Sequence, residues 1–139
     1  MIYRQYRSGF TLLELLVVLL IIALLAGYVG PKLFGEVDKA KIKSAAAQMK
    51  TLGDALDHYR LDLGNYPTTD QGLRGLVIKP DGASSKWQGP YLAKEIPRDP
   101  WDHAYVYRKP GTGGKDYDLL SYGADGKEGG SGIDADIAF

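Results

Sequence analysis

The sequence predicts an α+β fold in which the second half of one long N-terminal helix packs on a small antiparallel β-sheet. Three observations support this prediction. A run of twenty mostly apolar residues begins at Phe10 and ends at Val29. An apolar stripe at seven-residue spacing then continues the helix over residues 42–63. Finally, two short segments of alternating polarity, residues 104–108 and 116–122, flank a proline and three glycines, which indicates a β-hairpin.

Composition limits the classes of function that the chain can have. Its 139 residues suffice for one domain with an appendage. Lys plus Arg and Asp plus Glu each total 17, so the chain has no basic excess for binding nucleic acid. It has no cysteine, which excludes disulfides, thiolate zinc sites and thiol nucleophiles.

The N-terminal apolar run is long enough to cross a bilayer as a helix. Within it only Thr11, Glu14 and Tyr28 are not apolar. Arg4 and Arg7 precede it, and the positive-inside rule keeps this end in the cytoplasm. We therefore expect a single-pass membrane protein whose C-terminal domain lies outside the cytoplasm.

A cleavable secretory signal peptide is the alternative explanation of the same run. Small residues at Ala23, Ala26 and Gly27 could mark its cleavage site. The run is longer than an ordinary signal core, however, and a carboxylate such as Glu14 costs about 2.5–3.5 kcal/mol inside a bilayer. A segment that is removed has no use for that charge, which favours a run that stays attached.

The residues around Glu14 carry a family resemblance. Residues 9–14 spell G-F-T-L-L-E after a short basic leader, and this resembles the type IV prepilin signal. The resemblance implies that a prepilin peptidase removes residues 1–9 by cutting after Gly9, and that the new N-terminus at Phe10 is methylated. The helix of residues 10–34 would remain attached as a membrane anchor and, later, as the core of a filament.

This resemblance also suggests roles for Glu14 and Pro31. The freed amine of Phe10 on a neighbouring subunit would neutralise Glu14, which would then set the register between subunits. The alternative is an unpaired or protonated Glu14 near the membrane surface. Gly27, Gly30 and Pro31 predict a kink or a meltable stretch, and similar pilins carry a proline there.

Beyond the membrane the helix is predicted to be amphipathic. Its apolar positions form two series, Ile42, Met49, Leu56 and Leu63, and Ala45, Leu52 and Tyr59. A free-standing coiled coil could use the same spacing, but the strand-rich region that follows needs a cover, so packing on that region is expected. Gly64, Asn65 and Pro67 end the helix. A short helix is expected at residues 71–76, and an extended loop at 80–90.

The rest of the chain repeats a second family pattern over nearly its whole length. The matching residues are Tyr66-Pro67-Thr68-Thr69, Gln71-Gly72-Leu73, Gly89-Pro90-Tyr91-Leu92, Ile96-Pro97, Asp99-Pro100-Trp101, Tyr117-Asp118-Leu119 and Ser121-Tyr122-Gly123-Ala124-Asp125-Gly126. The pattern resembles the major pseudopilin of bacterial type II secretion, although Asp102 and His103 depart from its usual Gly and Asn or Pro. The resemblance implies a type IV pilin-like fold with a periplasmic domain at residues 35–139.

The resemblance further implies a structural role in protein export. The chain would be a homopolymer joined through its N-terminal helix, forming a periplasmic filament that drives folded exoproteins outward. Its partners would be minor pseudopilins, the prepilin peptidase and the inner-membrane secretion platform. Before assembly it would sit in the bacterial inner membrane. A type IV pilus subunit and a membrane-anchored periplasmic metal-binding domain remain the alternatives.

The glycine-rich C-terminal segment holds the candidate metal ligands. Asp125, Asp134 and Asp136 offer the oxygen ligands that calcium prefers, while an acidic solvated tail is the alternative by composition. Major pseudopilins bind one calcium in this loop. The resemblance therefore implies a structural calcium held by Asp125, by one or both of Asp134 and Asp136, and by the Leu120 carbonyl.

No constellation of residues predicts catalysis. His58 and His103 are expected to be ordinary surface residues, and the chain has no nucleophile-elbow serine. The glycines of residues 111–114 lack the lysine of a phosphate-binding loop. The sequence therefore predicts a protein that is not an enzyme.

Overall fold

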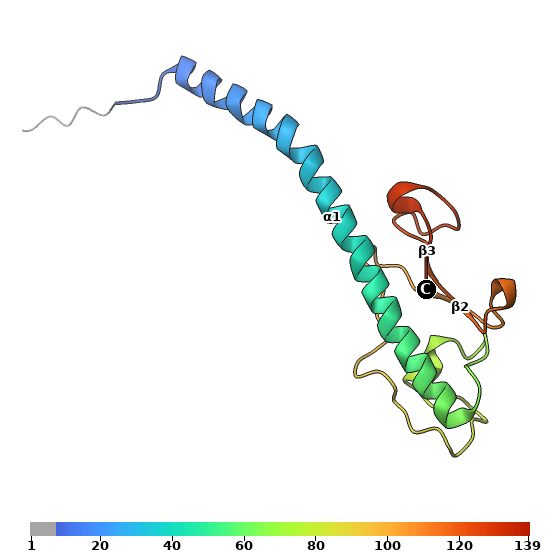
Figure 1. The fold of residues 1–139 in the computed structure, drawn as a ribbon. Coiled ribbons are helices and arrows are strands. Elements are labelled where there is room, and N and C mark those ends of the chain that lie inside the picture. The colour runs from blue at the N-terminus through green and yellow to red at the C-terminus, as the bar shows by residue number, and fades with distance from the viewer. Residues whose placement is uncertain (1–7) are drawn as a thin grey trace, which may run out of the picture. The chain divides into compact units, whose positions relative to one another are not determined.

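The computed structural model describes residues 8–139, so Arg4, Arg7 and most of the 1–9 leader lie outside the described part. The chain forms two compact units, an N-terminal unit of residues 1–37 and a C-terminal unit of residues 38–139. One helix, α1 (Leu12–Leu63), contributes to both (Figure 1). Helix α1 continues through Pro31 without a break, and the kink or melting expected there stays a prediction. Proline removes only one backbone N–H donor, and the helix is formed both before and after it.

The N-terminal unit is an apolar helix without cover. Its large hydrophobic side chains, from Phe10 to Val37, are each between 45% and 85% exposed. Among the described residues, α1 is the one helix long and apolar enough to cross a membrane. Because this much apolar surface is unfavourable in water, the unit needs a bilayer or another protein chain around it.

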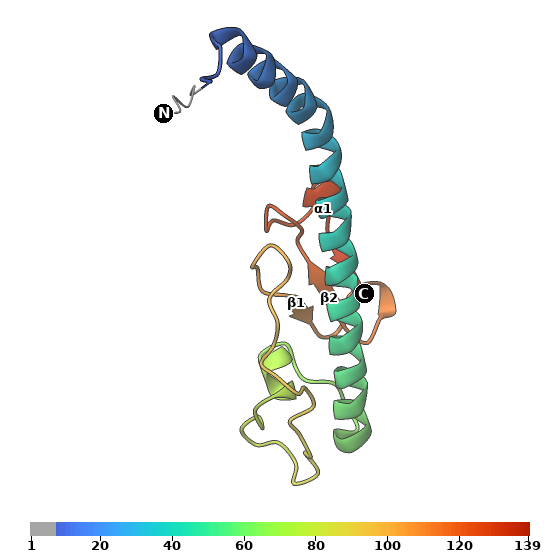
Figure 2. The same ribbon diagram turned by 90° about the vertical axis from the view of Figure 1, so that its left-hand side faces the viewer.

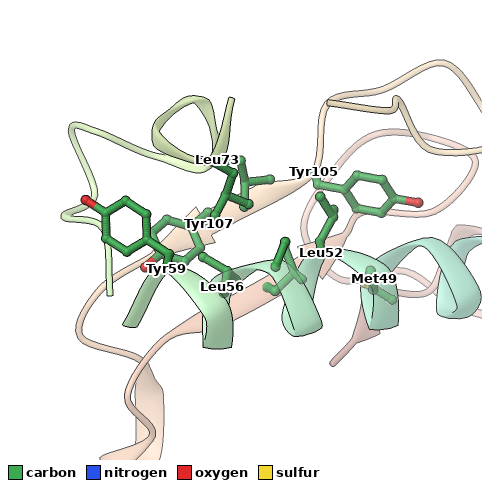
Figure 3. Close-up of a cluster of buried hydrophobic side chains, with 10 residues drawn as sticks. Met49, Leu52, Leu56, Tyr59, Leu73, Tyr105 and Tyr107 are labelled. Atoms are coloured by element: carbon green, nitrogen blue, oxygen red, sulfur yellow. The ribbon is translucent and has the colours of Figure 1, made fainter. Parts of the chain in front are cut away.

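The C-terminal unit has its core between α1 and the segments that follow. Both predicted apolar series contribute to it. The helix buries Ala45, Met49, Leu52, Ala55, Leu56 and Tyr59. Facing them are Leu73, Leu76, Tyr105, Tyr107 and Leu119 (Figure 3). Ile42 and Leu63, at the ends of the first series, are only half-buried.

The sheet has three short antiparallel strands in the order β1-β2-β3, two of which are labelled in Figure 2. They are β1 (Val106–Arg108), β2 (Asp118–Ser121) and β3 (Ile137–Ala138). The predicted hairpin corresponds to β1 and β2, which place Tyr107 opposite Leu119. Strand β3, whose Ile137 pairs with Ser121, was not predicted from the sequence.

Three short 3₁₀ helices complete the unit, at Leu73–Leu76, Thr112–Gly114 and Gly132–Asp134. The first lies within the short helix expected at residues 71–76. The expected loop at residues 80–90 contains no helix or strand. It is held where the indole Nε1 of Trp87 donates to the carbonyl of Gly75 at 3.1 Å.

Buried tyrosines tie these segments to the core. The hydroxyl of Tyr107 donates to the carbonyl of Pro67 at 2.7 Å, and that of Tyr105 donates to Gln48 on α1. Burial raises the pKa of Tyr105 to about 12. These hydroxyls therefore remain neutral donors over the physiological range.

Candidate functional sites

The first candidate site is the start of α1. Gly9 and Phe10 precede the helix, Phe10 is almost fully exposed, and a β-carbon at Gly9 would meet no atom within 4 Å. The peptide bond after Gly9 therefore lies in an open, non-helical segment. A protease needs such a segment because it must take an extended backbone into its active site. The cleavage itself stays a prediction.

Glu14 has a partner inside its own chain. Its Oε2 accepts the backbone N–H of Thr11 at 2.8 Å, and the Thr11 hydroxyl accepts the backbone N–H of Glu14 at 3.2 Å. This reciprocal pair is a capping box, which satisfies two N–H groups at the helix start and puts a negative charge near the positive end of the helix dipole. The predicted roles of Glu14 were pairing with another subunit or no pairing, although Thr-x-x-Glu is the sequence signature of this cap.

The second candidate site is the C-terminal loop, residues 123–136, between β2 and β3. Asp125 is exposed, and its Oδ1 accepts the backbone N–H of Lys127 at 3.0 Å. Both oxygens of Asp136 lie 3.0 Å from the backbone nitrogen of Gly129, so this carboxylate closes the turn in the middle of the loop. Asp134 is half-buried at the end of the third 3₁₀ helix.

Backbone carbonyls approach the loop glycines closely. A β-carbon at Gly123 would lie 2.8 Å from the carbonyl oxygens of Ile133 and Ala135, and one at Gly130 would lie 2.5 Å from that of Asp134. Both glycines have positive φ, +68° and +86°, so only glycine both adopts the backbone and leaves the space. The loop thus folds its own carbonyl oxygens inward.

The donors of this loop suit a hard cation in kind. They are carboxylate and carbonyl oxygens, which calcium prefers, without a nitrogen or sulfur ligand. Within residues 8–139, however, no three His, Asp or Glu side chains come together, so carbonyl or water oxygens would have to supply most ligands. Leu120 lies inside β2 between Val106 and Ala138, one residue before the strand ends. Its carbonyl as a ligand remains a prediction.

Three residues that sequence reasoning did not select lie beside this loop. Asp99 and Ser121 are buried and bonded to each other, with the Ser121 hydroxyl donating to Asp99 Oδ2 at 2.7 Å. His103, expected on the surface, is half-buried, with its Nδ1 3.2 Å from the Gly123 carbonyl oxygen. Its side chain is still 38% exposed, so it lies at the surface, but the turn of residues 99–103 brings its ring against the loop. Only the Asp-Pro-Trp motif pointed to this turn.

Two family models match this chain, and each covers one of the two candidate sites. A family model described as type II secretion system (T2SS), protein G matches residues 32–139. Another, described as the prokaryotic N-terminal methylation motif, matches residues 4–29. The second match covers the apolar run and the capping box, and the first covers the whole C-terminal loop.

Individual relatives agree with the family models over nearly the whole chain. The chain is 47% identical to the type II secretion system core protein G of Pseudomonas aeruginosa, covering 96% of this chain and 95% of that protein. It is 46% identical to the protein of the same name from Vibrio cholerae, covering 94% and 90%. A crystal structure of the major pseudopilin from the type 2 secretion system of enterohaemorrhagic Escherichia coli matches with a TM-score of 0.64 at 38% identity, over 78% of this chain and 93% of that one.

Proposed function

The chain belongs to the type II secretion system protein G family and is a structural subunit rather than an enzyme, and we propose that it is a major pseudopilin which polymerises through its apolar N-terminal helix. The filament that it forms is the pseudopilus, which drives folded exoproteins outward from the periplasm. Minor pseudopilins, the prepilin peptidase and the inner-membrane secretion platform are the proposed partners.

The uncovered helix of the N-terminal unit carries this proposal. Its side chains from Phe10 to Phe34 form an apolar surface far larger than soluble monomers expose. The helical residues from Leu12 to Phe34 span roughly 35 Å at 1.5 Å per residue, enough to cross the roughly 30 Å hydrocarbon core of a bilayer. Before assembly lipid covers that surface. After assembly the same helix of neighbouring copies replaces the lipid.

The order of events follows from the start of α1. The basic leader holds the N-terminus in the cytoplasm, and residues 35–139 cross into the periplasm. Cleavage after Gly9 frees the amine of Phe10, one residue before Thr11, whose backbone N–H is bonded to Glu14. In the filament we place the Phe10 amine of a neighbouring subunit at Glu14. The Glu14 carboxylate would then give up part of its hydrogen bonding to the Thr11 N–H and form an ion pair with that amine.

Filament formation in cells tests this function. The full chain, expressed with the secretion platform and prepilin peptidase, should yield filaments by electron microscopy and support export of an exoprotein. Glu14→Ala should abolish both, whereas Glu95→Ala, which removes an exposed carboxylate of the C-terminal unit, should change neither. Filaments from Glu14→Ala would contradict the pairing role. A chain that stays monomeric after detergent extraction would instead favour a merely anchored domain.

We also propose that the C-terminal loop binds one structural calcium. Two features of the loop support this: its carboxylate oxygens, and the carbonyl oxygens that approach Gly123 and Gly130. The chain also has no disulfide, and metal binding can stabilise a loop that has no other cross-link. Asp125 and one or both of Asp134 and Asp136 would hold the ion, with backbone carbonyls completing the set. Calcium would supply folding energy and no catalysis.

Thermal unfolding of the full chain in detergent tests the calcium proposal. Both tryptophans, Trp87 and Trp101, lie in the C-terminal unit, so their fluorescence reports on that unit alone. Calcium should raise the midpoint, and Asp125→Ala should abolish the effect. A midpoint that is the same in calcium and in excess chelator would refute the site.

A further inference from the structure

The most deeply buried carboxylate in the described chain is Asp99, whose side chain is fully shielded from solvent. Its Oδ1 accepts the backbone N–H groups of Trp101 at 3.1 Å and His103 at 2.8 Å. The backbone N–H of Asp99 donates to the His103 carbonyl at 2.8 Å, and that of Asp102 donates to the Asp99 carbonyl at 2.9 Å. The carboxylate is thus the centre of a closed turn, residues 99–103.

The second carboxylate oxygen of Asp99 bonds to the sheet and not to the turn. Its Oδ2 accepts the hydroxyl of Ser121, the last residue of β2, which is fully buried. The Ser121 hydroxyl oxygen in turn accepts the backbone N–H of Gly123, the first residue of the C-terminal loop, at 3.3 Å. A continuous hydrogen-bonded path therefore runs from the 99–103 turn through Asp99 and Ser121 into the loop.

The same turn touches the loop at a second place. The His103 ring lies against Gly126, where a β-carbon would approach the ring to 3.0 Å, and its Nδ1 lies near the Gly123 carbonyl. Ser121 also pairs with Ile137 across β2 and β3, so it stands where the loop leaves the sheet and where it returns. The bond from Ala124 N–H to the Ile133 carbonyl, 2.9 Å, closes the loop just beyond this point.

We propose that Asp99 and Ser121 are positioning residues that hold the C-terminal loop in the geometry needed to bind a divalent cation. This inference rests on the calcium site proposed above. Neither side chain is a ligand, because both are enclosed by the turn and the sheet. They act on the backbone between Ser121 and Ala124, directly before Asp125, and so fix where its carboxylate and the nearby carbonyls can meet.

A buried ionic group could instead serve stability alone, and the chain offers a matched control for that. Asp118 is also buried in β2, and its carboxylate accepts the backbone N–H and the hydroxyl of Thr112 at 3.0 and 3.2 Å. These bonds lie at the other end of the strand, in the hairpin between β1 and β2. Asp118→Asn therefore makes the same chemical change in the same strand without touching the loop.

Calcium titration of the full chain in detergent, followed by tryptophan fluorescence and calorimetry, tests the proposal. Asp99→Asn and the milder Ser121→Ala should each weaken calcium binding at least about tenfold, the lower bound found for residues that orient metal ligands. Asp118→Asn should bind as tightly as the unsubstituted chain. Equal weakening in all three variants, or unchanged affinity in Asp99→Asn, would overturn the proposal.

Amide hydrogen exchange in excess chelator tests the positioning role of Asp99 and Ser121 independently of calcium binding. Without metal, Asp99→Asn and Ser121→Ala should speed exchange at the Ala124 amide, which neither side chain contacts, and Asp118→Asn should not. If the unsubstituted chain binds no calcium, the metal site fails while this measurement still decides the positioning role. Unchanged exchange at Ala124 in both variants would remove that role.

Discussion

Gly53→Ala should lower the free energy of unfolding when Phe139 is present and raise it when Phe139 is replaced by alanine. The residue lies on the buried face of α1, and a β-carbon there would approach the Phe139 ring to 2.5 Å at Cε1 and Cζ. Gly53→Ala alone should therefore push the ring away. In a chain that also carries Phe139→Ala, the added methyl group should meet open space.

The expected size follows from two opposing effects. Replacing a mid-helix glycine with alanine stabilises by roughly 0.5–1 kcal/mol. Crowding a packed contact costs roughly 1–3 kcal/mol, and the lower part of that range applies because Phe139 is about half exposed, so its ring can move. Gly53→Ala should thus destabilise by about 0–2 kcal/mol alone, and stabilise by about 0.5–1 kcal/mol beside Phe139→Ala.

Chemical unfolding of the full chain in detergent measures this, with tryptophan fluorescence reporting on the C-terminal unit. The four chains of the double-mutant cycle should give a coupling free energy of about 1–3 kcal/mol. If Gly53→Ala changes the free energy of unfolding equally in both backgrounds, the Phe139 ring does not occupy the space over Gly53 and the packing described here is wrong.

Two further predictions concern the C-terminal unit. Burial raises the pKa of Tyr105 and of Tyr117 to about 12, above the value of 10.0 in the unfolded chain. The unfolded chain therefore ionises first as the pH rises. Their contribution to stability is complete below pH 10 and is lost between pH 10 and 12. Absorbance of phenolate and unfolding measured over that range should change together, and stability independent of pH there would contradict the burial. Asp102 has a φ of +67°, which suits glycine, so Asp102→Gly should be more stable than Asp102→Ala by about 1 kcal/mol in chemical unfolding, and the reverse order would contradict the backbone conformation.

Regular spacing made the helix and its packing predictable from sequence. The two series through Met49 and Leu52 occupy one face because of the helical period alone, and the structure buries that face. The hairpin was predictable for the same reason, since alternation and glycines are local signals. The end of the helix followed from Gly64, which adopts a φ of +83°.

The remaining features depend on contacts between distant residues. Asp99 and Ser121 are 22 positions apart, and no periodicity links a buried carboxylate to a buried hydroxyl. The two-residue strand β3 is too short for alternation to be recognised, and only its pairing with β2 defines it. Asp102 adopts a left-handed backbone conformation that glycine would adopt more easily, and its residue type alone does not predict that conformation.

Cysteine cross-linking within the N-terminal helix tests the central claim most directly. The chain has no native cysteine, so pairs introduced among residues 10–34 can report contacts between copies without interference. In cells with the secretion platform, suitable pairs should give a ladder of covalent multimers upon oxidation, and Glu14→Ala should eliminate it. Monomers alone from every pair, in a chain that is inserted and processed, would contradict polymerisation through this helix.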